Sequence, residues 1–219
     1  AIQFVPTHMP NSFAFKRYTR ESSSQHPFSL SPGSWERVRT MHWSREDEEL
    51  FMQELKKSYE EGTWFNRKNL LTGKKLKSEE EVRQQLHLDP AKKTAVIFSH
   101  VLWDATFFFG ESLFEDYEHW LIETVKVACK NTNVNWVIKL HPDYIWKMLK
   151  DGKDAKPRDV VALAAEVGEL PDHVQVVHPN TDITTYSFFA VTDYCITVRG
   201  TIGIEASCFG IPVLTAGTG

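Results

Sequence analysis

Hydrophobic positions from residue 94 onward form short apolar runs separated by amphipathic segments. The runs are nearly continuous, as is typical of strands buried on both faces, and they are TAVIFSH (94–100), NWVIKLHP (135–142), HVQVVHP (173–179), DYCITV (193–198) and IPVLTAG (211–217). Helical spacing lies between them, at 117–131, 159–169, 182–192 and 203–210. Strand–helix alternation with short links predicts an α/β fold with a Rossmann-like, doubly wound parallel sheet.

The N-terminal part has a different pattern. Residues 1–45 are rich in Ser, Pro, His and aromatic side chains and show no sustained period, which predicts irregular chain. Residues 45–62 predict an amphipathic helix that Ser44 caps, with acidic residues in its first turn. Ser78 and Glu81 form a capping box for a short helix that ends near Leu86.

Composition narrows the class of protein. The chain has 219 residues, 42% of them hydrophobic and 25% charged, which is typical of a soluble globular protein. Its net charge of −4 predicts no nucleic-acid partner. The three cysteines, Cys129, Cys195 and Cys208, form no CxxC pair, and we expect them to be small core residues in a reducing cytoplasm. No signal peptide or bilayer-spanning run is visible, so we expect a cytoplasmic protein.

Polar residues follow each predicted strand. They are Ser99-His100, Lys139 to Asp143, His178 to Asn180, Arg199-Gly200-Thr201 and the residues 216–219. Polar loops are common, so a single residue of this kind indicates little. In a parallel sheet, however, these strand ends lie along one edge, where ligands of such sheets bind. The combination therefore predicts a binding site at the carboxyl edge of the sheet.

The GTIG turn at 200–203 lies where a strand hands over to a helix. Unpaired N–H groups and the positive end of the helix dipole, together with Gly200, Gly203 and the Thr201 hydroxyl, favour a phosphate site. An ordinary N-cap by Thr201 is the alternative. Glu205, one helical turn further on, fits hydrogen bonding to sugar hydroxyls or a capping role. Arg199 and His141 would add donors to the phosphate.

Several nucleotide motifs are absent from the sequence. No GxGxxG follows the first strand, which argues against a nicotinamide or flavin dinucleotide site. No GxxxxGK[ST] occurs, which argues against a P-loop nucleoside triphosphatase. No DxD or compact His/Asp/Glu ligand set is present. We therefore expect no bound metal and no cofactor.

Two motifs carry a resemblance to a known family. KLHP at 139–142 and TVRGTIGIEASCFGIPVL at 197–214 resemble the donor-binding half of GT-B glycosyltransferases, above all bacterial capsule and surface-polysaccharide transferases of the Kdo-transferase and sialyltransferase-like groups. The resemblance covers residues 94–219. It implies a nucleotide-sugar donor held between two Rossmann-like domains, in which His141 and Thr201 contact the donor phosphate and Glu205 the ribose or sugar. Asp104, in the loop after the first strand, is then the candidate for acid–base catalysis.

The chain departs from this family in two respects. The turn reads Arg-Gly-Thr where related turns often carry paired hydroxyls, which leaves open whether the donor is a CMP-, UDP- or GDP-sugar. Residues 1–90 are also too short for a complete acceptor domain. We therefore expect a fragment, with 1–90 a connector and remnant of the acceptor domain and 91–219 a donor domain truncated at its C-terminus.

The resemblance implies a metal-independent glycosyltransferase that moves a sugar to a surface- or capsule-polysaccharide acceptor. This acceptor would be a saccharide or a lipid-linked molecule. A sugar-nucleotide epimerase or a CDP-alcohol phosphotransferase of the same architecture is an alternative, as is a non-catalytic binding domain that kept the fold. The aromatic clusters at 103–109 and 185–191 fit core packing. They also fit an acceptor wall, or peripheral contact with a lipid acceptor at the inner face of the membrane.

Overall fold

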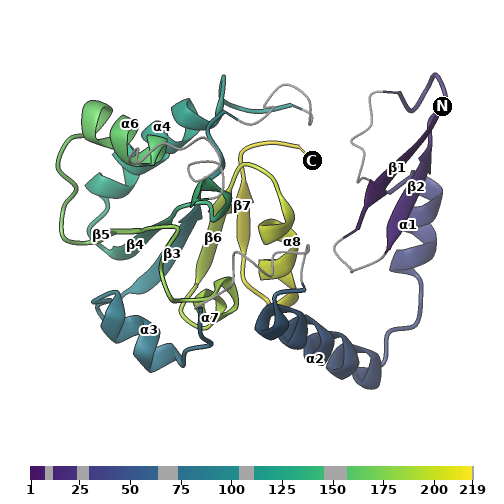
Figure 1. The fold of residues 1–219 in the computed structure, drawn as a ribbon, viewed down its shortest axis with the longest axis horizontal. Coiled ribbons are helices and arrows are strands. Elements are labelled where there is room, and N and C mark those ends of the chain that lie inside the picture. Colours follow the sequence, from purple (N-terminus) through teal and green to yellow (C-terminus); the bar gives the residue numbers. More distant parts are fainter. Residues whose placement is uncertain (8–11, 24–29, 64–73, 104–110, 146–156, 219) are drawn as a thin grey trace. The chain divides into compact units, whose positions relative to one another are not determined.

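The computed structural model describes residues 1–7, 12–23, 30–63, 74–103, 111–145 and 157–218 (Figure 1). The chain divides into two compact units. One comprises Ala1–Gly73 with Gly219, and the other Lys74–Thr218. The predicted catalytic candidate Asp104 lies outside the described residues.

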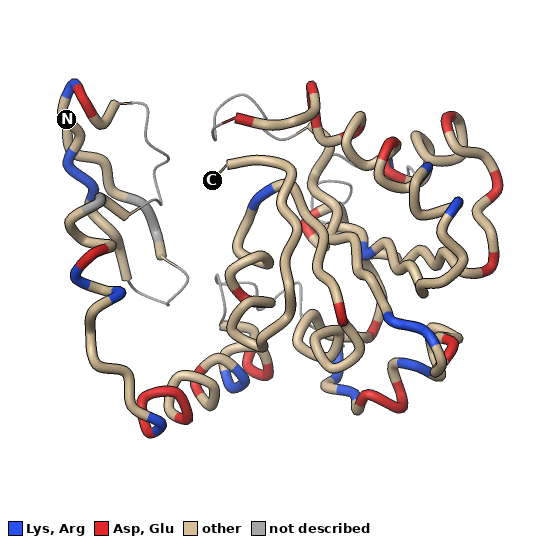
Figure 2. The backbone as a smooth tube through the Cα atoms, turned by 180° about the vertical axis from the view of Figure 1, so that it is seen from behind, with Lys and Arg blue, Asp and Glu red and all other residues tan. Residues whose placement is uncertain are grey.

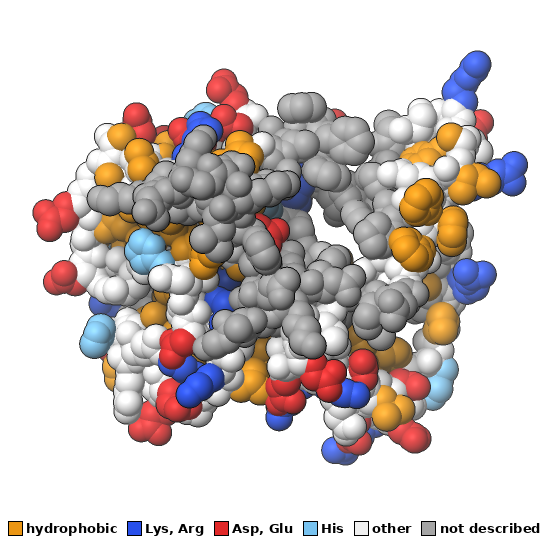
Figure 3. Space-filling model, in the orientation of Figure 1, with side chains coloured by type: hydrophobic (Ala, Val, Ile, Leu, Met, Phe, Trp, Pro, Cys, Tyr) orange, Lys and Arg blue, Asp and Glu red, His pale blue; other side chains and the backbone are white. Residues whose placement is uncertain are grey.

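The first unit contains a hairpin that the sequence pattern did not predict. Strands β1 (Ile2–Pro6) and β2 (Phe13–Arg17) pair antiparallel, with Phe4 opposite Phe15. Alternation over five residues is too short to stand out as a period, which is why irregular chain was expected here. One face of the hairpin is apolar and exposed, and hydrophobic side chains are visible on this unit in Figure 3. This face carries Ile2, Phe4, Phe13 and Phe15.

Two helices complete the described part of this unit. Helix α1 (Pro32–Arg39) begins after Ser31, whose side chain accepts the N–H of Ser34. Helix α2 (Arg45–Glu61) confirms the predicted cap, because Ser44 and Asp47 form a capping box. Gly62 ends α2 in the left-handed conformation that glycine adopts readily. Acidic and basic residues are mixed along α2 (Figure 2).

The second unit contains the predicted parallel sheet. Its strands are β3 (Lys93–Phe98), β4 (Val134–Lys139), β5 (Val174–Val177), β6 (Tyr194–Thr197) and β7 (Val213–Thr215). They stand in the order β5-β4-β3-β6-β7, and each neighbouring pair is parallel. The Rossmann-like α/β fold class is therefore confirmed by the topology of the sheet.

Helices cover both faces of this sheet (Figure 1). Helices α4 (Tyr117–Lys130) and α6 (Arg158–Glu166) contact each other, and both contribute to the core cluster that contains Ile97 and Ile138. On the opposite face, α8 (Thr201–Cys208) contacts β6 and β7, and α3 (Glu79–Gln85) contacts α7 (Thr185–Phe189). Phe188 and Phe189 of α7 are buried, which favours core packing for the 185–191 cluster.

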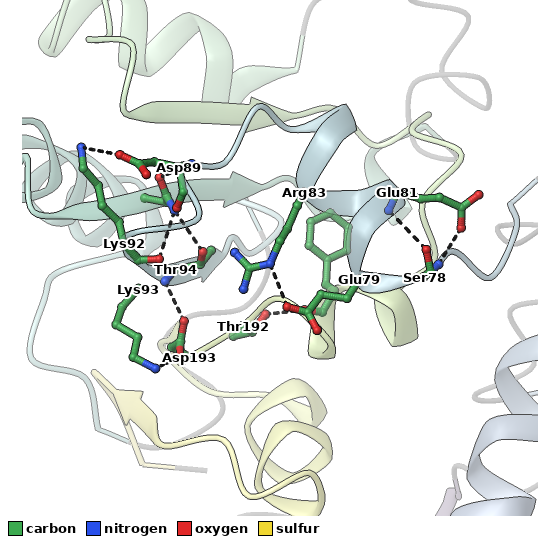
Figure 4. Close-up of polar contacts among 12 residues, drawn as sticks. Ser78, Glu79, Glu81, Arg83, Asp89, Lys92, Lys93, Thr94, Thr192 and Asp193 are labelled. Carbon is green, nitrogen blue, oxygen red and sulfur yellow. Dashed lines mark hydrogen bonds and ion pairs between the residues drawn. The ribbon is translucent and has the colours of Figure 1, made fainter.

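Polar contacts close the amino edge of the sheet (Figure 4). The Asp193 carboxylate accepts the N–H of Thr94 at 2.9 Å and pairs with Lys93 at 2.7 Å, which ties the segment before β6 to the start of β3. Ser78 and Glu81 form the predicted capping box of α3. A surface groove of about 660 Å³ runs over α3 and the turn after it, so it lies near the amino end of β3.

The cysteines follow the expectation only in part. Cys195 is buried in β6, and Cys129 is half-buried. Cys208 is exposed at the end of α8, where the expected core position was wrong. Gly203, five positions earlier, faces β6 and β7. Cys208, the last residue of the short helix α8, therefore lies on the side of the helix away from those strands.

Candidate functional site

The strand order places a topological switch point between β3 and β6. From β3 the chain continues to β4 and β5 on one side, and it then returns to β6 on the other side of β3. In open α/β sheets, ligands bind in the crevice beyond the carboxyl ends of such strands. The segments there are Ser99-His100 after β3 and Val198 to Gly200 after β6.

Helix α8 begins directly at this switch point. Its N-cap residue is Gly200, at φ 113° and ψ 167°, a region that is almost exclusive to glycine. Thr201 is the first helical residue, so the alternative in which Thr201 is the N-cap is wrong. Gly200 has no side chain that could cap the helix. The helix start therefore keeps the N–H groups and the positive dipole end that favour an anion.

His100 supports the turn from the neighbouring strand. Its Nε2 accepts the N–H groups of Val198 at 3.2 Å and Arg199 at 3.4 Å, and it lies 3.0 Å from the Thr197 hydroxyl. A ring nitrogen that accepts hydrogen bonds carries no proton, so the neutral ring is protonated on Nδ1. The ring stacks on Tyr117, with centroids 4.3 Å apart.

His100 was not among the residues that the sequence singled out for the site. Its only signal was its position directly after a buried strand. His178 shares that signal but is exposed. The contacts of His100 with the 197–199 segment join residues about a hundred positions apart, which no local pattern reveals.

His141 lies at the adjoining strand end, after β4. Its N–H donates to the Ser99 hydroxyl at 3.2 Å. Its Nδ1 accepts the N–H of Asp143 at 3.2 Å and lies 3.9 Å from the Asp143 carboxylate. This contact leaves the proton of the neutral ring on Nε2, which is a hydrogen-bond donor. Ser99-His100 thus connects the His141 loop with the 199–201 turn.

Arg199 is buried and directed towards the end of β7. Its Nη2 donates to the carbonyl of Glu111 at 3.1 Å. A Cβ at Gly217 would lie only 2.9 Å from the same nitrogen, so the glycine makes room for the guanidinium. Residues 111–113 in turn bond to residues 216–218. The buried guanidinium of Arg199 therefore joins the segment at Glu111 to the chain after β7.

Gly203 and Glu205 lie further along α8. A Cβ at Gly203 would meet Val213 at 3.5 Å and Thr197 at 3.8 Å, so Gly203 faces the sheet and allows close packing. Its N–H donates to the Gly200 carbonyl. Glu205 is buried, and burial raises the pKa of its carboxyl to about 8. A carboxyl that stays protonated at neutral pH can both donate and accept a hydrogen bond.

The structure thus gathers His141, Arg199, Gly200 and Thr201 at neighbouring strand ends, with His100 between them. Among the described residues, no cluster of three or more His, Cys, Asp or Glu side chains is arranged to hold a metal ion. Within the same ranges, no helix is long and apolar enough to cross a bilayer.

Comparison with known proteins identifies no family by sequence. No family profile matches the chain, and no curated protein sequence matches it.

Several solved structures are similar to the chain. Staphylococcus aureus MnaA, in a structure with UDP, is 17% identical with a TM-score of 0.40, and the match covers 61% of this chain and 30% of MnaA. A putative UDP-N-acetylglucosamine 2-epimerase from Listeria monocytogenes is 15% identical with a TM-score of 0.42, over 67% of this chain and 33% of the epimerase. KpsC from Thermosulfurimonas dismutans, a β-Kdo 2,7 transferase, is 22% identical with a TM-score of 0.39, over 68% and 46%. The chain spans between 30% and 46% of their lengths.

Proposed function

We propose that the carboxyl edge of the sheet binds the phosphate and sugar of a nucleotide-sugar donor, and that the chain is the donor-binding part of a glycosyltransferase. The observation that carries this proposal is the start of α8. The helix begins at Gly200, which has no side chain to cap it, at the topological switch point and next in sequence to the buried Arg199.

The donors around this point suit a diphosphate. The Thr201 hydroxyl and the first N–H groups of α8 come from one side, and the Nε2–H of His141 comes from the loop after β4. Arg199 supplies fixed positive charge, because its guanidinium stays protonated and donates a hydrogen bond to the backbone carbonyl of Glu111. His100 keeps the backbone of the turn in place, since its Nε2 accepts hydrogen bonds from two backbone N–H groups of the turn.

Glu205 suits the sugar part of the donor. A buried carboxyl that is protonated at neutral pH adds no negative charge next to a phosphate, and it can hydrogen-bond a ribose or sugar hydroxyl. We assign this contact to Glu205 and the phosphate contacts to His141, Arg199 and Thr201.

Sugar transfer at this site would rest on positioning and on stabilisation of the departing phosphate. As the bond from the anomeric carbon to the phosphate oxygen breaks, negative charge gathers on the nucleotide. The helix dipole, Arg199 and His141 would stabilise that charge without a metal ion. The acceptor would be a surface or capsule polysaccharide, in the form of a saccharide or of a lipid-linked precursor.

A binding screen tests the proposal. Isothermal titration of the chain with CMP, UDP and GDP should reveal binding of at least one nucleotide. His141→Ala removes a donor to the phosphate and should weaken that binding roughly tenfold or more, as expected for a hydrogen bond to a charged group. His119→Ala, an exposed histidine in the first turn of α4, is the matched control and should bind as the wild type does.

The outcomes separate the possibilities. If no nucleotide binds to the wild type, the proposed function is wrong for this chain. If a nucleotide binds and His141→Ala leaves its affinity unchanged, the phosphate assignment of His141 is wrong. Activity assays with the donor alone then separate an epimerase, which needs no acceptor, from a transferase, which does.

A further inference from the structure

The hairpin of β1 and β2 exposes its apolar face more than its polar face. Phe4, Phe13 and Phe15 share one face, and between 58% and 74% of each residue is exposed. Gln3 and Lys16 lie opposite each other on the other face, where both are partly buried. An antiparallel sheet with one face in water normally shows the reverse, with its polar side chains outward. The exposed face therefore has the character of an interaction surface.

The three phenylalanine rings form one continuous surface. The centroid of the Phe4 ring lies 6.1 Å from that of Phe13 and 6.4 Å from that of Phe15. Ile2, which is 75% exposed, continues this surface along β1. We call these four side chains the hairpin patch.

The area of the hairpin patch favours a lipid surface over a second copy of the chain. Four side chains of this size, exposed to this extent, offer roughly 500 Å². A stable protein interface buries about 800 Å² on each partner. Insertion into the interfacial layer of a bilayer has no such threshold, because each apolar side chain that leaves water contributes separately.

Basic residues accompany the hairpin patch. The first twenty residues contain Lys16, Arg17 and Arg20 and no Asp or Glu, although the whole chain has a net charge of −4. Arg17 pairs with Ile2 across the hairpin, so it lies on the same face as the patch, at the open end of the hairpin. Positive charge beside an apolar surface is complementary to a membrane that contains anionic lipids.

The apolar and charged parts follow each other along β2. Four residues separate Phe13 from Arg17, which corresponds to about 13 Å in an antiparallel strand. Amphipathic segments at a membrane surface bury their apolar side about 5–10 Å into the boundary between headgroups and acyl chains. Phe13 and Phe15 can therefore enter this boundary while Arg17 stays at the level of the lipid phosphates.

We propose that the hairpin of β1 and β2 binds the surface of a bilayer that contains anionic lipids. The hairpin patch enters the boundary layer, and Arg17 contacts lipid phosphates. This inference goes beyond the proposed function, because it concerns the unit Ala1–Gly73 and requires no nucleotide. It also differs from the lipid contact expected at 185–191, where Phe188 and Phe189 are buried.

Vesicle binding tests the apolar part of the proposal. The full chain, without nucleotide, should sediment with vesicles of equal parts phosphatidylcholine and phosphatidylglycerol. Phe15→Ser should weaken this binding roughly tenfold, because one apolar ring no longer leaves water. Val127→Ser, at an apolar residue of α4 that is 62% exposed, is the matched control and should bind as the wild type does. Equal binding by Phe15→Ser and wild type would overturn the proposal.

The charged part has a separate test. Wild-type binding should be tighter to the mixed vesicles than to pure phosphatidylcholine, and salt should weaken it. Arg17→Gln should weaken binding to the mixed vesicles roughly fivefold, the effect of one cation near an anionic surface. Arg45→Gln, at an exposed arginine in the first turn of α2, is the control. Equal losses in the two variants would overturn the proposed contact of Arg17.

Two further outcomes would overturn the proposal. One is a wild type that binds neither kind of vesicle. The other is a dimer in sedimentation experiments that Phe15→Ser dissociates, without vesicle binding, which would assign the hairpin patch to a second copy of the chain. Circular dichroism verifies that each variant is folded. Vesicle binding by a chain that binds no nucleotide would support this inference and remove only the proposed function.

Discussion

Glu205 is a buried acid in the proposed site, and its pKa links the site to stability. Burial raises the pKa of this carboxyl from 4.5 to about 8 in the folded protein. Between these values the folded state binds the proton more tightly than the unfolded state does. The free energy of unfolding therefore falls as the pH rises through this range, by at most about 1.4 kcal/mol per pH unit.

Glu205→Gln should remove this pH dependence. Between about pH 7 and about pH 8.5, urea unfolding of the wild type should show declining stability, whereas the variant should decline much less. Glu166→Gln, at an exposed acid of α6, should behave as the wild type does. Equal pH profiles for wild type and Glu205→Gln would show that the Glu205 carboxyl is not shifted by burial.

At the scale of elements, the turn from β6 to α8 depends on one glycine. Gly200 has φ 113°, where an L side chain is strained, so Gly200→Ala should lower the free energy of unfolding by about 1–3 kcal/mol. Gly203→Ala, three residues on, is the matched comparison. Its Cβ would meet Val213 at an ordinary 3.5 Å, and alanine favours the helix by up to about 1 kcal/mol.

Urea unfolding midpoints of the two glycine variants decide this point, provided that the m-value stays constant. A Gly200→Ala variant as stable as Gly203→Ala would mean that the turn adopts another conformation. Because α8 starts at this turn, loss of nucleotide binding should accompany the loss of stability only in Gly200→Ala.

Most elements of the second unit follow from local pattern. Continuous apolar runs predicted the strands, and each is present, because a strand covered on both faces needs apolar side chains on both. The Ser44 and Ser78 caps were also predictable, since capping depends on residues three positions apart. The hairpin of β1 and β2 was missed, because five exposed residues a strand carry little periodicity.

At the scale of the whole molecule, every described residue of the proposed site lies in the unit Lys74–Thr218. A fragment of residues 74–218 should therefore bind the nucleotide found in the screen with an affinity within about twofold of the full chain, a difference well under 1 kcal/mol. Circular dichroism would verify that the fragment is folded. A folded fragment with tenfold weaker binding would show that residues 1–73 contribute to the site.

The sequence by itself determined the alternation of strands and helices, the polar strand ends and the two motifs at 139–142 and 197–214, because these depend on neighbouring residues. Only the tertiary structure decided the strand order β5-β4-β3-β6-β7 and hence which strand ends adjoin. It placed His100 against the 197–199 segment and the N–H of His141 on the Ser99 hydroxyl. Such contacts join residues 42 to 99 positions apart. They arise from the packing of crossovers around β3, which local periodicity does not encode.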